Sequence, residues 1–181
     1  LVLGHRDCQP STLLAKAGHL LLTNHYPAYD DLYRNGFVHT RVAAYQTHGL
    51  AVDVFRLRQN EPVSYQEFEN VDVMTGSQSA LTNMLGAGMY KSILVHALNP
   101  QMWDVLRLST LPIIVWVHGA EIQPWWRRAH NYGSEECRQL GKLESERRMG
   151  FWRTLLNPMP ANLQLVFVSH HFAEEVMEDL G

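Results

Sequence analysis

Short runs of apolar residues recur along the chain and are separated by longer stretches whose apolar positions follow helical spacing. A run that is apolar at every position is typical of a parallel strand whose two faces are both covered by helices. The clearest run, residues 113–117, stops abruptly at His118-Gly119. We predict buried strands over residues 19–23, 50–55, 92–97, 112–117 and 163–168.

Helices are predicted between these strands. Val38, Val42 and Tyr45 share one face of a helix that begins at Gly36 and is closed by Gly49. Further helices are predicted to start near residues 77, 99, 134 and 169, where Ser or Asn can cap a first turn, and the longest runs over residues 134–156. Residues 63–75 indicate either a hairpin or one bent strand with a turn at Asn70.

Alternation of strands with helical crossovers predicts an α/β fold, because parallel strands need such connections. We expect a Rossmann-like three-layer sandwich with a mainly parallel sheet. Residues 1–17 are interpreted as a lead-in or linker and residues 18–181 as one domain. Because the chain opens on Leu1 rather than methionine, we expect it to be a piece of a longer protein.

Polar residues follow four of the predicted strands: Thr23-Asn24-His25, His96, His118 and Ser169-His170. The carboxyl ends of parallel strands share one edge of a sheet, and ligands bind outside that edge. Any one of these residues, His96 above all, can be a satisfied strand end, but together they predict a polar crevice. The connection over residues 24–35 is long for a strand-to-helix loop, which favours a functional role.

Several chemistries remain open at this edge. The helix start at Gly36 suits a phosphate, although the glycine can simply begin a helix. His118 with Glu121, or His170 with His171, could ligate a metal, but neither spacing matches a recognised zinc pattern and no metal is expected.

Some protein classes are excluded by missing motifs, and the role of one segment is left undecided. The chain lacks a GKS/T phosphate loop and a G-x-S-x-G elbow, and Gly86-x-Gly88 ends a helix instead of opening one, the reverse of a dinucleotide fingerprint. Residues 125–128, two tryptophans followed by two arginines, lie in a predicted loop. They suit an acceptor platform, an anchor in a membrane headgroup region, or a loop folded onto the domain.

Composition narrows the possible partners and compartments. The chain is 46 % hydrophobic and 18 % charged, which is typical of a globular protein, and its net charge of −3 gives no general reason to bind nucleic acid. Two distant cysteines, Cys8 and Cys137, suggest a reducing compartment. No apolar run approaches the roughly 18 residues of a membrane span. We expect a cytoplasmic protein, with peripheral membrane contact left open.

The order of the motifs resembles a known family. Tyr26-Pro27, residues 33–38 and residues 49–54 are followed by His118-Gly119-x-Glu121 after a buried strand, and then by Val168-Ser169 opening a helix. Over about residues 18–181 this is similar to the N-terminal domain of family 4 glycosyltransferases of the GT-B architecture.

The resemblance implies transfer of a sugar from a nucleotide-sugar donor with retention of configuration, without a metal or other cofactor. The N-terminal domain would bind a glycan, lipid-linked or small-molecule acceptor, and a C-terminal domain would grip the nucleotide. His118 and Glu121 would be catalytic. Asn35, Gly36 and Phe37 would approach the donor phosphates. The acceptor would contact residues near the crevice, namely His25, Tyr26, Tyr29, Arg34, Gly119, Trp125, Arg127, Ser169 and His170.

Two departures from the family pattern limit this expectation. Only Gly36 stands where the family often has a glycine pair, and the C-terminal domain with its E-x7-E motif is absent from these residues. We therefore expect the acceptor-binding half of an enzyme, inactive alone. The alternatives are a non-catalytic ligand-binding or protein-interaction domain on the same scaffold and half of a nucleotide-sugar epimerase.

Overall fold

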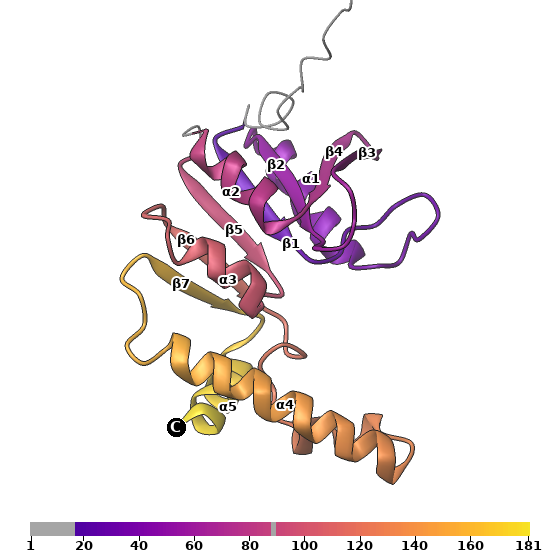
Figure 1. Cartoon of the computed structure of the whole chain (residues 1–181), viewed down its shortest axis with the longest axis vertical. Coiled ribbons are helices and arrows are strands. Elements are labelled where there is room, and N and C mark those ends of the chain that lie inside the picture. Colours follow the sequence, from indigo (N-terminus) through magenta and orange to yellow (C-terminus); the bar gives the residue numbers. More distant parts are fainter. Residues whose placement is uncertain (1–16, 88–89) are drawn as a thin grey trace, which may run out of the picture.

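The computed structural model describes residues 17–87 and 90–181. Its strands are β1 (His19–Thr23), β2 (Val52–Leu57), β3 (Ser64–Phe68), β4 (Val71–Gly76), β5 (Ser92–His96), β6 (Ile113–Val117) and β7 (Leu163–Phe167). Its helices are α1 (Gly36–Thr47), α2 (Gln78–Gly86), α3 (Pro100–Leu106), the 3₁₀ helix η2 (Trp125–Asn131), α4 (Glu135–Leu155) and α5 (His170–Leu180). Figure 1 shows the sheet with α2 and α3 in front of it and α1 behind.

The described strands form one sheet in the order β3-β4-β2-β1-β5-β6-β7. Every neighbouring pair is parallel except β3 with β4, which is antiparallel. The chain runs outward from β1 to β2 and β4, and then returns to the other side of β1 to continue through β5, β6 and β7. This order confirms the predicted Rossmann-like α/β sandwich. It also places the topological switch point, where such sheets bind ligands, between β1 and β5.

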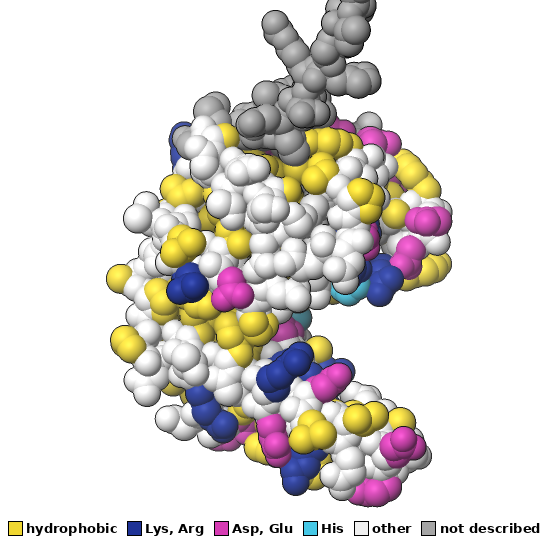
Figure 2. All heavy atoms as spheres, viewed as in Figure 1, with side chains coloured by type: hydrophobic (Ala, Val, Ile, Leu, Met, Phe, Trp, Pro, Cys, Tyr) yellow, Lys and Arg dark blue, Asp and Glu magenta, His cyan; other side chains and the backbone are white. Residues whose placement is uncertain are grey.

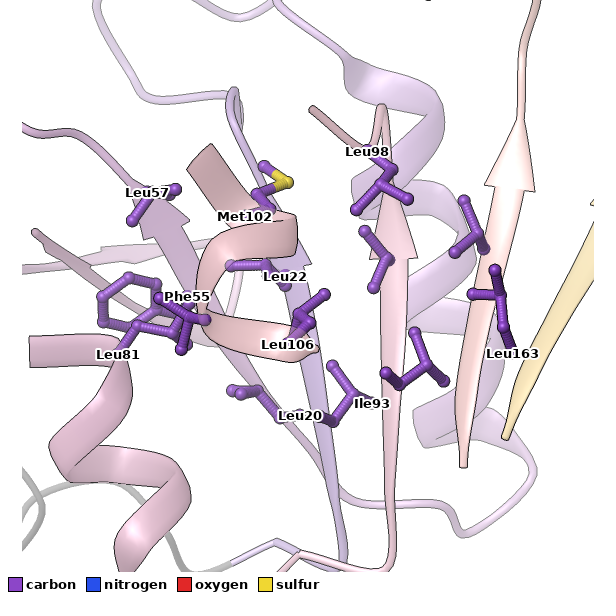
Figure 3. Close-up of a cluster of buried hydrophobic side chains, with 14 of the residues drawn as sticks. Leu20, Leu22, Phe55, Leu57, Leu81, Ile93, Leu98, Met102, Leu106 and Leu163 are labelled. Carbon is purple, nitrogen blue, oxygen red and sulfur yellow. The ribbon is translucent and has the colours of Figure 1, made fainter. Parts of the chain in front are cut away.

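Both faces of β1 are buried, which fixes it at the centre of the molecule. Leu20 and Leu22 are fully buried on the face covered by α2 and α3, where the side chains of Figure 3 interlock. Leu21 is fully buried on the opposite face, against Val38 and Val42 of α1. The continuous apolar run predicted this two-sided burial.

Four helix starts are confirmed by their caps. The side chains of Ser77, Asn99, Ser134 and Ser169 each accept a hydrogen bond from the backbone N–H three residues later. Helix α1 differs, because its N-cap residue Asn35 adopts a left-handed conformation (φ 56°) and its side chain makes no capping bond. The first turn of α1 is therefore left without a side-chain cap.

Several boundaries differ from the prediction. Strand β2 starts two residues late, because Leu50 still donates to the carbonyl of Tyr45 in the turn that closes α1. Residues 63–75 form the hairpin alternative, whose turn places Glu69 and Asn70 at positive φ. The predicted loop at residues 125–131 is the 3₁₀ helix η2. Two predictions concern residues outside the described ones: the lead-in, of which residues 1–16 are not described, and Gly88 of the Gly86-x-Gly88 pair.

The apolar run of β6 predicted burial on both faces, but only one face of this strand is buried. Ile113, Val115 and Val117 are buried, whereas Ile114 and Trp116 on the other face are only half-buried. The neighbouring edge strand β7 is open on this same face, where Val166 is exposed. Packing of β6 therefore comes mainly from the α3 and α5 side of the sheet.

Truncation of a central side chain tests this account of the core. Replacing Leu22, which is fully buried in β1, by alanine leaves a cavity and is expected to lower the unfolding free energy by about 2–5 kcal/mol. Leu108→Ala, at a side chain that is 76 % exposed, is the matched control and should change it by less than about 0.5 kcal/mol. Urea unfolding measures both; equal effects would contradict the assigned core.

Candidate functional site

Two histidines meet at the carboxyl ends of β5 and β6. Nδ1 of His96 lies 2.9 Å from Nε2 of His118, and the two rings meet edge to edge with an interplanar angle of 15°. The ring of Trp116 lies nearly parallel to that of His96, with centroids 5.2 Å apart. The ring of Phe37, at the start of α1, lies 4.5 Å from that of His118. The sequence predicted that these strand ends converge, and the helix start joins them.

Both histidines are neutral at pH 7. Burial, together with the neighbouring His118 and Arg41, lowers the pKa of His96 to about 3. Burial also lowers the pKa of His118, with Glu121 opposing and Arg41 adding to the effect. In the hydrogen bond between the two neutral imidazoles, one ring donates its N–H and the other accepts. His118 therefore acts as a hydrogen-bonding group rather than as a cation.

The turn after β6 is held by its own side chains. Oε1 of Glu121 accepts a hydrogen bond from the backbone N–H of His118 at 2.6 Å, and the carbonyl of Glu121 accepts another from the indole of buried Trp152. Gly119 has a backbone φ of 123°, which residues with a side chain rarely adopt. Glu121, predicted to be catalytic, thus has its carboxylate on the backbone of the turn, where it fixes His118.

His25 joins the rim through an arginine that the sequence analysis missed. Nη2 of Arg58, which follows β2, donates to Nδ1 of His25 at 2.8 Å. This bond requires an unprotonated Nδ1, and burial followed by Arg58 lowers the pKa of His25. The carbonyl of His25 also accepts a 3.5 Å hydrogen bond from the side chain of Asn35. The start of α1 therefore contacts both sides of the rim, through Asn35 to His25 and through Phe37 to His118.

The predicted tyrosines point elsewhere. Tyr26 is only 2 % exposed, and its hydroxyl hydrogen-bonds Nδ1 of His39 at 2.8 Å, so it belongs to the core. The hydroxyl of Tyr29 accepts from the backbone of Glu69 in the β3–β4 turn. Arg34 is half-exposed and pairs with Asp31 at 3.5 Å. Arg34 is the only one of these three residues whose side chain carries a charge, and that charge is paired with Asp31.

The predicted acceptor residues beyond β6 are mostly engaged in structure. Arg127 of η2 forms ion pairs with Asp179, Glu175 and Glu178 of α5, the closest at 2.5 Å. The hydroxyl of Ser169 caps α5, and His170 is exposed at the start of that helix. Trp125 packs edge-on against Trp126 and lies under Lys142 of α4. Arg127 thus joins η2 to α5, and Trp125 joins η2 to α4.

Figure 2 shows the molecule hollowed on one side, between the block that contains the sheet and the arm formed by η2 and α4, with histidine side chains on the wall. Among the described residues, no three side chains of metal-ligating type are grouped to hold an ion. In the same part of the chain, every helix is too short or too polar to cross a bilayer.

Comparison of the chain with protein-family models, with curated proteins and with solved structures gives no match.

The neutral histidines predict a specific pH dependence. Between the ordinary histidine pKa of 6.5 and the lower folded values, the unfolded chain binds more protons than the folded one. Stability is thus present above pH 6.5 and is lost as pH falls, by up to about 1.4 kcal/mol per pH unit for each histidine. Urea unfolding at pH 7, 6 and 5 should show a shallower slope for His96→Phe, with exposed His130→Phe as the control for histidine number. Equal slopes for wild type and His96→Phe would contradict the assignment.

The ion pairs of Arg127 predict a local effect. Arg127→Met removes the contacts that join η2 to α5, so the amides of η2 should exchange hydrogen faster while those of the central strands are unchanged. Arg128→Met, for which the described residues include no ion pair, is the control. Unaltered exchange in η2 would show that Arg127 is free to serve a ligand.

Proposed function

We propose that this chain is the acceptor-binding half of a retaining glycosyltransferase, which moves a sugar from a nucleotide-sugar donor to a glycan, lipid-linked or small-molecule acceptor. One observation carries the proposal: the start of α1 and the His118-Gly119 turn, which the resemblance assigns to the donor phosphates and the transferred sugar, contact each other at the rim through Phe37. These segments are about 80 residues apart in the sequence.

The start of α1 supports a role with phosphate. Its first turn, residues 36–39, contains no acidic side chain, and Asn35 directs its amide to the carbonyl of His25 instead of capping the helix. Unpaired backbone N–H groups and the positive end of the helix dipole favour an anion at this position. The α1 start is thus proposed to face the donor diphosphate.

The state of His118 supports contact with a sugar. A neutral imidazole offers its outer nitrogen, Nδ1, to a hydroxyl group and avoids placing a positive charge beside the reacting carbon. Glu121 has its carboxylate on the backbone of His118, so the proposal gives it a positioning role and uses no protein nucleophile. The leaving phosphate takes the acceptor proton on the same face, and stabilisation of the leaving diphosphate supplies most of the rate acceleration.

A second domain completes the proposed enzyme. It would grip the nucleotide, so the present chain is expected to bind acceptor without turnover, and the nucleotide sugar is a co-substrate rather than a cofactor. We also propose a cytoplasmic location, because the proposed donor is a nucleotide sugar of the cytoplasm. Exposed Trp126 on η2 offers a point of peripheral contact for a lipid-linked acceptor.

The test is a transfer assay with a protein that extends this chain by the proposed nucleotide-binding domain. A panel of nucleotide sugars and saccharide acceptors should give a glycosylated product, and His118→Ala should lower kcat/KM by about 100-fold or more, as loss of a transition-state hydrogen bond does. His48→Ala, at the far end of α1, is the control.

Three outcomes separate the alternatives. Normal transfer by His118→Ala would remove His118 from the site. Isomerisation or hydrolysis of a nucleotide sugar without acceptor would identify the epimerase alternative. Binding of a ligand with no turnover of any nucleotide sugar would indicate a non-catalytic domain.

A further inference from the structure

The first half of helix α4 carries two exposed leucines. Leu140 is 59 % exposed and Leu143 is 65 % exposed, and no residue from 135 to 144 is buried. The buried residues of the helix all follow later in the sequence and are Ser145, Met149, Trp152 and Leu155. In Figure 1 the first half of α4 extends away from the sheet, as part of the arm that also contains η2. The two leucines are therefore not part of the domain core.

Both leucines belong to a stripe along the outward side of α4, which consists of Glu136, Leu140, Leu143 and Arg147. Because successive helical residues are about 100° apart, these four positions fall within about 60° of one another. Their spacing of four, three and four residues is that of the contact positions of a coiled coil. The buried positions 145, 149 and 152 lie on the opposite side of the helix, so this α4 stripe faces away from the domain.

The α4 stripe ends in two opposite charges. Within the described residues, the side chains of Glu136 and Arg147 take part in no ion pair or hydrogen bond. Two other pairs of charged residues form ion pairs along the same helix: Arg138 with Glu135, and Arg148 with Glu144. The stripe thus offers two leucines between a carboxylate and a guanidinium group that both lack a partner.

We propose that the α4 stripe is the contact surface for a second copy of this chain, with the two helices antiparallel about a twofold axis between residues 141 and 142. In that arrangement Leu140 lies against Leu143 of the second copy, and Glu136 lies against Arg147 of the second copy. The symmetry repeats both contacts, so each dimer contains two leucine contacts and two ion pairs. Parallel helices would instead place Glu136 against Glu136 and Arg147 against Arg147. The charges therefore select the antiparallel orientation.

The proposed dimer is weak and reversible. A single pair of helices makes a smaller contact than the roughly 1,200–2,000 Å² that a stable complex buries. Exposed ion pairs add little affinity, so the leucines supply most of the association and the charges set its direction. This inference does not depend on the proposed function.

Sedimentation equilibrium of the chain at about 10 µM to 1 mM tests the leucine contact. The average molar mass of the wild type should rise with concentration from that of one chain toward that of two. Replacing Leu140 and Leu143 together by alanine should weaken this association by about 10-fold or more, because it removes the apolar part of the contact. Leu108→Ala, at an exposed leucine outside α4, is the matched control and should leave the association unchanged.

Charge reversal tests the orientation. Glu136→Arg makes both ends of the stripe positive and Arg147→Glu makes both negative, so each variant alone should associate about 10-fold or more weakly than the wild type. An equimolar mixture of the two variants should associate again, because every charged contact then joins an arginine to a glutamate. The double variant Glu136→Arg/Arg147→Glu should dimerise like the wild type. All these positions are exposed, and equal thermal unfolding midpoints check that the variants remain folded.

Several outcomes would overturn the proposal. A wild type that stays monomeric at the highest concentration would leave the stripe to a partner other than a second copy. A dimer that is unaffected by loss of both leucines would lie on another surface. Unchanged association of either single charge variant, or no association in their mixture, would reject the antiparallel pairing. Growth beyond two chains would reject the twofold axis.

Discussion

Burial of β1 on both faces is the constraint on which the rest of the structure depends. Leu21 packs beneath α1 and Leu22 beneath the α2 and α3 layer, so the connections that leave β1 and β5 must go to opposite sides of the sheet. Their divergence opens the carboxyl edge between these two strands. The loop of residues 24–35 follows β1 at that opening and α3 follows β5, while His118 reaches the same edge from the end of β6.

The same burial decides the chemistry available at the edge. His96 ends the strand next to β1, where it is fully buried, and the cost of charging it there keeps it neutral. The orientation of the His118 ring is set by its hydrogen bond to the neutral ring of His96 and by its contact with Phe37. The Glu121 carboxylate then fixes the backbone of His118. His118 is thus positioned by His96 of β5, by Phe37 of α1 and by Glu121 of its own turn.

The apolar runs predicted the order of elements and the convergence of the strand ends, because burial of a strand is recorded in consecutive residues. Arg58 was missed because the second strand was placed two residues early, which left this arginine outside the predicted edge. Tyr26 and Arg127 were predicted to contact the acceptor because they lie in long predicted loops, but their side chains have partners in His39 and in the carboxylates of α5. Which way a loop side chain turns depends on such partners, and a single sequence does not record them.

The charged side chains around the crevice differ in how they are paired. Arg34 pairs with Asp31, Arg56 and Arg58 share the single carboxylate of Glu61, and Arg127 faces three carboxylates. The edge also contains neutral groups, namely imidazole nitrogens and the backbone N–H groups at the start of α1, beside the cation of Arg41, for which the described residues include no ion pair. Neutral donors and acceptors discriminate by the number and direction of hydroxyl groups, and an uncapped helix start adds a preference for one phosphate. In the proposed function, the saccharide acceptor would use the neutral groups and the donor diphosphate would use the start of α1.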